Sequence, residues 1–464
     1  MLVDWSFEKL QKITNGSKGS FKEDFKIKGF SIDTRSLKKG DLFCALKGDR
    51  YDGHDFLLQA YKKGASCFLL SETKKDIPSL PFIKVENVLK ALERIAKNTR
   101  RRIDASFIAI TGSVGKTGTK EMIKLALSNS GKAFANEGNL NNHIGVPLSM
   151  SNIPYDSDYC ILELGMNKKG EIRRLSNLVA PEIGIITAIE NTHLKGLKSL
   201  KNILEAKSEI LANIKKDGCF IYNSDTNYSD KLKKQAQKIK IKTIISYGKN
   251  KNSDIQFLKK KKLRDKFLIE ARYFKEKISW KMPELSDHWY TNSLCILGIG
   301  KYYDINLPSL LKLLENFKLP SGRGNLVIAE KWLKKFYIID DSYNSSPASL
   351  SAALDNFNEM KCIGKKIAII GDMNELGKKS KFFHLNLKKK IESSNINIIL
   401  TIGKFMKKLN LELSSKLTKL HFEDLYELEN ELKKIISSDD CLLIKGSHSI
   451  GLYSFVKNIL KDET

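Results

Sequence analysis

One short segment limits the possible folds of this chain more than any other. The run TGSVGKT follows the apolar stretch SFIAIT and opens a helix-like stretch. A glycine-containing loop between a strand and a helix lets backbone N–H groups converge on phosphate oxygens, and the helix N-terminus favours the bound anion. The lysine supplies positive charge and the threonine a magnesium ligand. The segment therefore predicts a phosphate-binding loop made of Thr111, Gly112, Ser113, Val114, Gly115, Lys116 and Thr117.

The loop departs from the commonest spacing at one position. Ile110 stands where the pattern GxxxxGK[ST] has its first glycine. A chance GxxGKT sequence in an ordinary loop is therefore the alternative interpretation. The strand before the segment and the helix after it favour phosphate binding.

Short apolar runs alternate with helix-like stretches, which predicts an α/β fold with mostly parallel sheets. SFIAIT, YCILELG and IGIIT are the first strands, and FYIIDD, KKIAIIGDM, INIILTIG and CLLIKG form a second doubly wound unit. KLPSGRG separates the two units and suits a linker. A chain of 464 residues is too long for one core. We expect a small N-terminal α/β domain in residues 1–100, a central parallel-sheet domain with the phosphate loop in 101–318, and a C-terminal Rossmann-like domain in 319–464.

The formal net charge of +27 raises the alternative of a basic phosphate-loop NTPase that binds nucleic acid. Lysine is spread along the whole chain, and the run Lys259–Lys262 falls between the expected elements, which is typical of solvated surface. We therefore expect no nucleic-acid partner. The seven cysteines form no CxxC pair, and neither a signal peptide nor a membrane-spanning run is visible. These features predict a cytoplasmic protein with no membrane span and with its cysteines in the core.

Three further side chains could complete a metal site beside the loop. Glu163 ends the strand YCILELG, His193 follows the strand IGIIT, and Lys207 lies on the helix LKNILEAKSEIL. A carboxylate suits magnesium, and an imidazole at a neighbouring strand end can reach a second ion. Taken singly, the glutamate could be a cap, the histidine structural, and the lysine a surface ammonium paired with Glu205 or Glu209. Their joint position at successive strand ends favours a functional site.

Over essentially its whole length the chain resembles the Mur ligase family. The segments TGSVGKT, GNLNNHIGVPLS, ELGMNKKGEI, DDSYNSSPASLSAAL, GDMNELG with His384, and KGSHSI are similar to signature segments of that family. SIDTRSLKKGDLFCALKGDRYDGHDF resembles its UDP-binding domain. DSYNSSP is typical of the branch that adds D-alanyl-D-alanine, whereas the branch that adds the third amino acid usually has a DNPR-like segment. Two departures stand out: SDHWYTN keeps only His288 and Asn292 of the family's GxHNxxN pattern, and His448 replaces a common arginine.

The resemblance implies an ATP-dependent ligase that joins UDP-N-acetylmuramoyl-tripeptide to D-alanyl-D-alanine through an acyl phosphate. It implies that residues 1–100 bind UDP, that ATP and two Mg²⁺ ions are used, that Lys207 is converted to a carbamate, and that the protein is a monomer. The catalytic residues it implies are Lys116, Glu163, His193, Lys207, Arg323 and Asp341. The metal ligands it implies are Thr117, Glu163, His193 and Lys207.

The resemblance also implies the binding residues. For the nucleotide these are the phosphate loop with Asn292, Arg323 and Asp341; for the other substrates they are Thr34, Arg35, Asn141, Asn142, Tyr343 and Asn344. The alternatives with the same fold are the branch that adds the third amino acid and a folate polyglutamate ligase. The alternative from another class is the basic nucleic-acid-binding NTPase.

Overall fold

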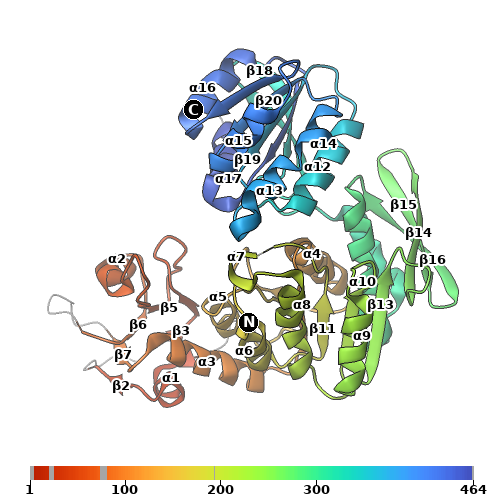
Figure 1. Ribbon diagram of the computed structural model, residues 1–464. Helices are drawn as coiled ribbons and strands as arrows, with labels where there is room; N and C mark the ends of the chain where they lie inside the picture. The colour runs from red at the N-terminus through yellow and green to blue at the C-terminus, as the bar shows by residue number, and fades with distance from the viewer. Residues whose placement is uncertain (1–4, 20–25, 74–80, 193, 462–464) are drawn as a thin grey trace.

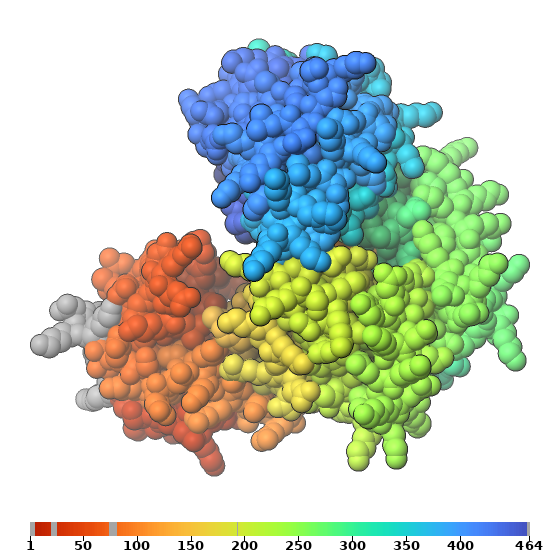
Figure 2. Space-filling model, in the orientation of Figure 1, coloured from red at the N-terminus to blue at the C-terminus, as the bar shows by residue number. Residues whose placement is uncertain are grey.

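The computed structural model describes residues 5–19, 26–73, 81–192 and 194–461 and contains three α/β domains (Figure 1). The N-terminal domain lies beside the middle domain, and the C-terminal domain stands over another edge of it. Figure 2 shows a hollow between the N-terminal and C-terminal domains, above the middle domain. The expected α/β fold with three domains is confirmed.

The N-terminal domain is built on a five-stranded sheet with the order β2-β7-β6-β5-β4. All neighbouring pairs are parallel except β2 and β7. The apolar runs in GDLFCAL and SCFLL form two of its inner strands, β5 and β6. The elements are β1 Trp5–Ser6, α1 Phe7–Thr14, β2 Ser17–Lys18, β3 Lys26–Ile27, β4 Gly29–Ser31, β5 Asp41–Cys44, the 3-10 helix η1 Gly53–Phe56, α2 Leu57–Lys62, β6 Cys67–Leu70, β7 Phe82–Lys84 and α3 Val88–Arg102.

Helix α3 joins the N-terminal domain to the middle domain. Asn87 caps its first turn, since the side-chain oxygen accepts from the Lys90 N–H at 2.9 Å. Its buried residues recur at helical spacing and include Leu92 and Ile95. The helix packs against α5 of the middle domain, whose Leu148 belongs to the N-terminal core. Removing α3 would therefore expose an apolar face of the middle domain.

The middle domain contains a nine-stranded sheet with the order β16-β15-β14-β13-β12-β11-β8-β10-β9. The strands from β9 to β14 pair in parallel, and β15 and β16 extend the sheet as antiparallel neighbours. The elements are β8 Ser106–Thr111, α4 Lys116–Leu127, β9 Ala133–Ala135, α5 Gly145–Ser151, β10 Tyr159–Glu163, α6 Glu171–Val179, β11 Ile183–Ile186, α7 Leu194–Leu197, α8 Leu200–Ser208, η2 Glu209–Asn213, β12 Cys219–Asn223, α9 Ser229–Lys238, β13 Thr243–Gly248, β14 Ile255–Lys262, β15 Lys266–Tyr273, β16 Glu276–Pro283, α10 Asp287–Tyr303, α11 Leu307–Lys312 and η3 Leu313–Asn316.

The expectation that Lys259–Lys262 lies between elements is wrong. These residues form the second half of β14 and pair with β15. They are exposed, as expected of solvated surface. The lysine run has no apolar alternation, so its pairing depends on the neighbouring strand and not on its own pattern.

The C-terminal domain has a six-stranded sheet with the order β17-β18-β22-β19-β20-β21. Only β17 runs antiparallel to its neighbour. The elements are β17 Asn325–Lys331, β18 Lys334–Asp340, α12 Pro347–Glu359, β19 Lys366–Gly371, η4 Gly377–Lys379, α13 Ser380–Leu385, α14 Lys388–Glu392, β20 Ile398–Ile402, α15 Lys404–Glu412, β21 Thr418–Phe422, α16 Leu425–Ile435, β22 Cys441–Lys445, η5 His448–Ile450 and α17 Leu452–Ile459.

Two hydrogen bonds outside the linker connect the C-terminal domain to the middle domain. The Lys195 N–H, on α7, donates to the carbonyl oxygen of Glu375 at 2.8 Å. The Asn356 amide, on α12, donates to the Ser286 hydroxyl at 2.9 Å. Gly322, in the KLPSGRG linker, has φ 77°, and a side chain there would meet Tyr343 and Tyr453. The linker therefore turns tightly between the domains.

The cysteines are structural. Six of the seven are buried, Cys362 is partly buried, and all are free thiols. Burial raises the pKa of the Cys160 and Cys219 thiols to about 12, so these groups are inert near neutral pH. No helix in the described part of the chain is long and apolar enough to cross a membrane.

Candidate functional site

The predicted phosphate loop lies between β8 and α4, the strand–loop–helix context that the sequence indicates. In Figure 1, α4 begins at the edge of the middle domain that faces the C-terminal domain. Gly115 has φ 81°, and a β-carbon there would lie 2.6 Å from the Asn292 amide nitrogen. Ser113 fixes the loop, since its hydroxyl accepts from the Glu190 N–H at 2.9 Å and donates to the Glu190 carbonyl at 3.0 Å. Glycine is favoured at position 115 because of its positive φ, and Asn292 of α10 packs where a β-carbon would lie.

Two lysine side chains converge on one carbonyl oxygen of this loop. Lys116 and Lys207 each donate to the Gly112 oxygen at 2.8 Å. Lys207 is 1% exposed, although it lies on a helix. The two acids that could have paired with it are used elsewhere: Glu205 binds Lys169, and the Glu209 carboxylate accepts from backbone N–H groups at the start of α6. The surface ion pair considered from the sequence is therefore absent.

This arrangement changes the acid–base behaviour of both lysines. Burial lowers the pKa of Lys207 well below that of an ordinary lysine, and the Lys116 ammonium lowers it further. Burial also lowers the pKa of Lys116, and the nearby Arg323 contributes. Glu163 acts on both in the opposite direction. Lys207 is thus more readily deprotonated than a surface lysine.

Glu163 ends β10, next to the loop, because β10 and β8 are parallel neighbours. Its carboxylate accepts from the Thr117 hydroxyl at 2.8 Å and from the Asn141 amide at 2.7 Å. A carboxylate and a hydroxyl are hard oxygen ligands of the type that Mg²⁺ prefers. The donor set therefore fits magnesium, which Thr117 and Glu163 could hold.

Sequence reasoning missed two residues behind Glu163. The Asn136 side chain, which is fully buried, accepts from the Glu163 N–H at 2.8 Å and donates to the Leu140 carbonyl at 2.8 Å. The ammonium of Lys120, also fully buried, donates to the Asn136 carbonyl. This network holds the end of β10 against the loop that carries Asn141. The position of Lys120, one helical turn after Lys116, is the signal that could have drawn attention to it.

Arg323 connects the linker to the phosphate loop. One guanidinium nitrogen, Nη2, lies 3.4 Å from the Thr117 hydroxyl. The guanidinium also stacks over the Tyr343 ring, 4.2 Å from its centroid. The Tyr343 ring makes edge contacts with His448 and Tyr453. Arg323 therefore stands between the two domains, where its charge faces the loop.

Asp341 follows β18 and is paired with a buried lysine that sequence reasoning did not assign. The Lys445 ammonium lies 2.6 Å from Asp341 Oδ2 and donates to the Asn344 carbonyl at 3.0 Å. Loss of hydration raises the pKa of Asp341, while Lys445 and Arg323 oppose this effect. A signal for Lys445 was present: it ends the strand CLLIKG, just as Asp341 follows the strand FYIID.

The remaining predicted residues are more scattered. Asn292 is buried on α10 beside Gly115. The Asn142 side chain accepts from the N–H groups of Ile144 and Gly145, in the turn that leads into α5. In the N-terminal domain, Thr34 donates to Gln59 at 2.8 Å, and Arg35 is exposed and paired with Asp33 at 2.6 Å. His193 lies outside the described residues.

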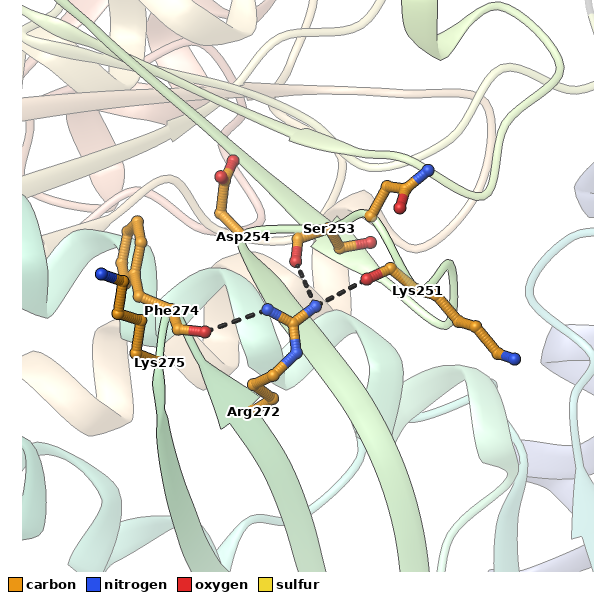
Figure 3. A pocket seen from close by; sticks show the side chains of 7 residues that line it. Lys251, Ser253, Asp254, Arg272, Phe274 and Lys275 are labelled. Carbon is orange, nitrogen blue, oxygen red and sulfur yellow. Dashed lines mark hydrogen bonds between the residues drawn. The ribbon is translucent and has the colours of Figure 1, made fainter.

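The structure also has a surface pocket that none of the predicted site residues lines. It has a volume of about 290 Å³ and lies at the β13–β14 connection and the β15–β16 turn. Figure 3 shows that the Arg272 guanidinium donates to the carbonyl oxygens of Lys251, Ser253 and Phe274. Through these hydrogen bonds Arg272 joins two turns, which gives the arginine a structural role. We therefore assign the pocket no ligand.

Comparison with known proteins gives consistent matches along the chain. Residues 26–100 match the model described as Mur ligase family, catalytic domain; residues 110–300 match the Mur ligase middle domain; and residues 322–448 match the Mur ligase, glutamate ligase domain. The UDP-N-acetylmuramoyl-tripeptide--D-alanyl-D-alanine ligase of Rickettsia prowazekii is 33% identical, with 92% of this chain and 93% of that protein covered. The ligase of the same name from Buchnera aphidicola subsp. Baizongia pistaciae is 35% identical, with 99% of each chain covered. The crystal structure of MurF from Acinetobacter baumannii superposes with a TM-score of 0.83 at 26% identity, covering 99% of this chain and 100% of that one.

Proposed function

The chain belongs to the Mur ligase family, and from this premise we propose that it joins D-alanyl-D-alanine to UDP-N-acetylmuramoyl-tripeptide. It is an ATP-dependent ligase of peptidoglycan synthesis, and its substrates are small molecules. Relatives that share this activity by name match more than nine-tenths of the chain. The contact of Arg323 with Thr117 is the observation that best supports the proposal, because it brings the positive charge of Arg323, in the linker, to the phosphate loop.

The chemistry is the transfer of the γ-phosphoryl group of ATP to the terminal carboxylate of the tripeptide. The carboxylate oxygen forms a bond to phosphorus and ADP leaves. The free amine of D-alanyl-D-alanine then attacks the acyl carbon, and phosphate leaves with one of the original carboxylate oxygens. Carboxylate and triphosphate repel each other, so Lys116 and Arg323 offset negative charge while the loop fixes position.

The enzyme uses Mg²⁺, and Thr117 and Glu163 would hold it. A bound Mg²⁺ would offset the charge of the phosphates and polarise the γ-phosphoryl group. We assign a second ion to His193 and to a carbamate on Lys207. A neutral amine combines with carbon dioxide and releases one proton, which converts a cation into an anionic oxygen ligand. The lowered pKa of Lys207 supports this assignment, because it favours the neutral amine.

We assign the remaining roles from the resemblance to the Mur ligase family. Thr34 and Arg35 are assigned to the UDP moiety, and Asn141 and Asn142 to the part of the substrate that enters the middle domain. Asn292 contacts the adenine, and Asp341 serves the ribose and the reacting groups. Tyr343 and Asn344 face the incoming dipeptide. Closure of the three domains over the site would exclude water from the acyl phosphate.

We assign the enzyme to the cytosol and to a monomeric state. The free, mostly buried thiols suit a reducing compartment. A single chain supplies all the described site groups, including Lys116, Glu163, Arg323 and Asp341, so a second copy is not needed to complete the site.

A coupled ADP-release assay tests the proposal. With UDP-N-acetylmuramoyl-tripeptide present, ADP release should require D-alanyl-D-alanine and should not be supported by single amino acids. Tripeptides ending in diaminopimelate and in lysine are assayed in parallel, since either can be the natural substrate. ADP release that depends on a single amino acid and on the shorter UDP-linked dipeptide would instead identify the branch that adds the third residue.

A further inference from the structure

Lys445 is a buried cation that the proposed mechanism does not use. It ends β22, and only 2% of its side chain is exposed. Its ammonium contacts the Asp341 carboxylate at 2.6 Å and donates to the Asn344 carbonyl at 3.0 Å. Both partners lie in the loop that leads from β18 to α12, the loop to which we assign dipeptide and nucleotide contacts.

The sheet explains why these groups meet. Strands β18 and β22 are parallel neighbours, and Asp340 is in register with Ile444. Asp341 and Lys445 are therefore the next residues at the same carboxyl edge of the sheet, where α/β folds place their ligand sites. The Asp341 N–H also donates to the Ile444 carbonyl at 3.1 Å. The pair is thus fixed by strand register and not by a flexible surface contact.

Stability alone does not account for the pair. Removing two charges from water costs about as much as their attraction returns, so an apolar pair of similar size would serve the core equally well. The loop also has other anchors: the Tyr343 N–H donates to the Gly322 carbonyl at 3.1 Å, and Ser346 and Ser349 form a capping box on α12. Lys445 instead binds Asp341, whose side chain remains 22% exposed.

We propose that Lys445 is a positioning residue for ligation. It holds the Asp341 carboxylate and the backbone of Asn344 in the conformation that binds the nucleotide and the dipeptide. The inference rests on the proposed function. It predicts that Lys445 acts on the step that uses the C-terminal domain and leaves the binding of the UDP-linked substrate unchanged. On α10 of the middle domain, loss of hydration lowers the pKa of His288, and the charge of Lys445 lowers it further. Lys445 therefore lies at the face that the two domains share.

The test is steady-state ADP release by the full chain carrying Lys445→Met, with UDP-N-acetylmuramoyl-tripeptide, ATP and D-alanyl-D-alanine each varied. We expect kcat to fall at least tenfold and KM for the dipeptide to rise, while KM for the UDP-linked substrate stays within twofold. Lys445→Arg should recover at least a third of kcat, because a guanidinium can bind both partners. In an Asp341→Asn background, Lys445→Met should change kcat less than threefold, because the lysine acts through that carboxylate.

A matched control lies in the neighbouring strand. Lys366 begins β19, is also buried, and binds the Asn358 carbonyl and Asn395 at the opposite edge of the same sheet. Lys366→Met should keep kcat within twofold. This control distinguishes the loss of Asp341 positioning from the general effect of removing a buried ammonium. If Lys445→Met does not fold, Lys445→Gln takes its place, and the same fall in kcat is expected.

Two results would overturn the inference. One is a kcat and dipeptide KM at wild-type values in Lys445→Met. The other is an equal loss of kcat in the Asp341→Asn background. A wild-type protein whose ADP release ignores D-alanyl-D-alanine would instead refute the proposed function, so the two failures are distinguished by the wild-type control.

Discussion

Lys116 and Lys207 donate to the same acceptor, the carbonyl oxygen of Gly112, at 2.8 Å each. Burial lowers the pKa of Lys207 well below the ordinary value, and the Lys116 ammonium at the same oxygen lowers it further. The consequence is a lysine that loses its proton more easily than a surface lysine. This is the property that reaction with carbon dioxide requires.

The first prediction concerns this lysine. Lys207→Ala should be nearly inactive, and acetate should restore part of the rate, because a small carboxylate can occupy the position of the carbamate. The measurement is ADP release across a series of acetate concentrations, with chloride at equal ionic strength as the control. A variant that stays active without acetate would defeat the carbamate assignment, and a dead variant that acetate cannot restore would remove its support.

Lys116→Ala should abolish ATP turnover and leave the fold intact. The ammonium stands at the loop that receives the phosphates, and loss of such a charge typically lowers kcat by a factor of about 100 or more. Circular dichroism checks the fold, and ADP release checks turnover. Ligation close to the wild-type rate would refute the assignment of the phosphate loop.

Glu163→Gln should raise the Mg²⁺ concentration needed for half-maximal activity and lower the maximal rate. The variant keeps the size of the side chain but removes the charge that we assign to the metal. Magnesium titrations of ADP release measure both effects. Asp156→Asn is a matched control, because this partly exposed acid of the same domain pairs with Lys132; its titration should overlay the wild type. Identical magnesium curves for Glu163→Gln and wild type would exclude Glu163 as a ligand.

Arg35→Ala should weaken binding of the UDP-linked substrate by about tenfold, the effect expected for loss of one charge-assisted contact to phosphate. ATP affinity should not change, because Arg35 lies in the N-terminal domain. Calorimetry with each ligand separates the two. This point variant is preferable to removal of residues 1–100, since that cut would divide α3 near its end and uncover α5. Unchanged affinity for the UDP-linked substrate would place its site elsewhere.

The pH dependence of kcat should follow the protonation of the Asp341 carboxylate. Its pKa is raised by loss of hydration, so the carboxylate is protonated, and activity is lost, at a higher pH than for an ordinary aspartate. The charges that act on it are Lys445, Arg323 and Asp340; the two cations lower its pKa and Asp340 raises it. Lys445→Met removes one of the cations and should move the acid limb of the kcat profile to higher pH. An acid limb that does not move would show that this carboxylate is not the group titrated.

Local patterns in the sequence were enough to predict the order of the elements and the main loop. The apolar runs SFIAIT and YCILELG became β8 and β10, because short buried strands of a parallel sheet are apolar on both faces. Since these strands are neighbours, Glu163 meets Thr117 at their carboxyl ends, as the strand-end argument anticipated.

What the sequence could not reveal depends on contacts between distant segments. Lys445 meets Asp341 only because β18 and β22 are neighbours in register, a pairing across about a hundred residues. The burial of Lys120 also depends on its contact with the Asn136 carbonyl, in the segment that follows β9. The strand formed by Lys259–Lys262 is likewise set by its partner β15.

The most direct test of the account follows the oxygen atoms of the tripeptide. UDP-N-acetylmuramoyl-tripeptide labelled with ¹⁸O in its terminal carboxylate is incubated with the enzyme, ATP, Mg²⁺ and D-alanyl-D-alanine, and the products are analysed by mass spectrometry. We predict UDP-N-acetylmuramoyl-pentapeptide, ADP, and phosphate that carries one ¹⁸O atom, because the acyl phosphate releases a carboxylate oxygen with the phosphoryl group. Phosphate without ¹⁸O, or phosphate release that does not require the dipeptide, would contradict it.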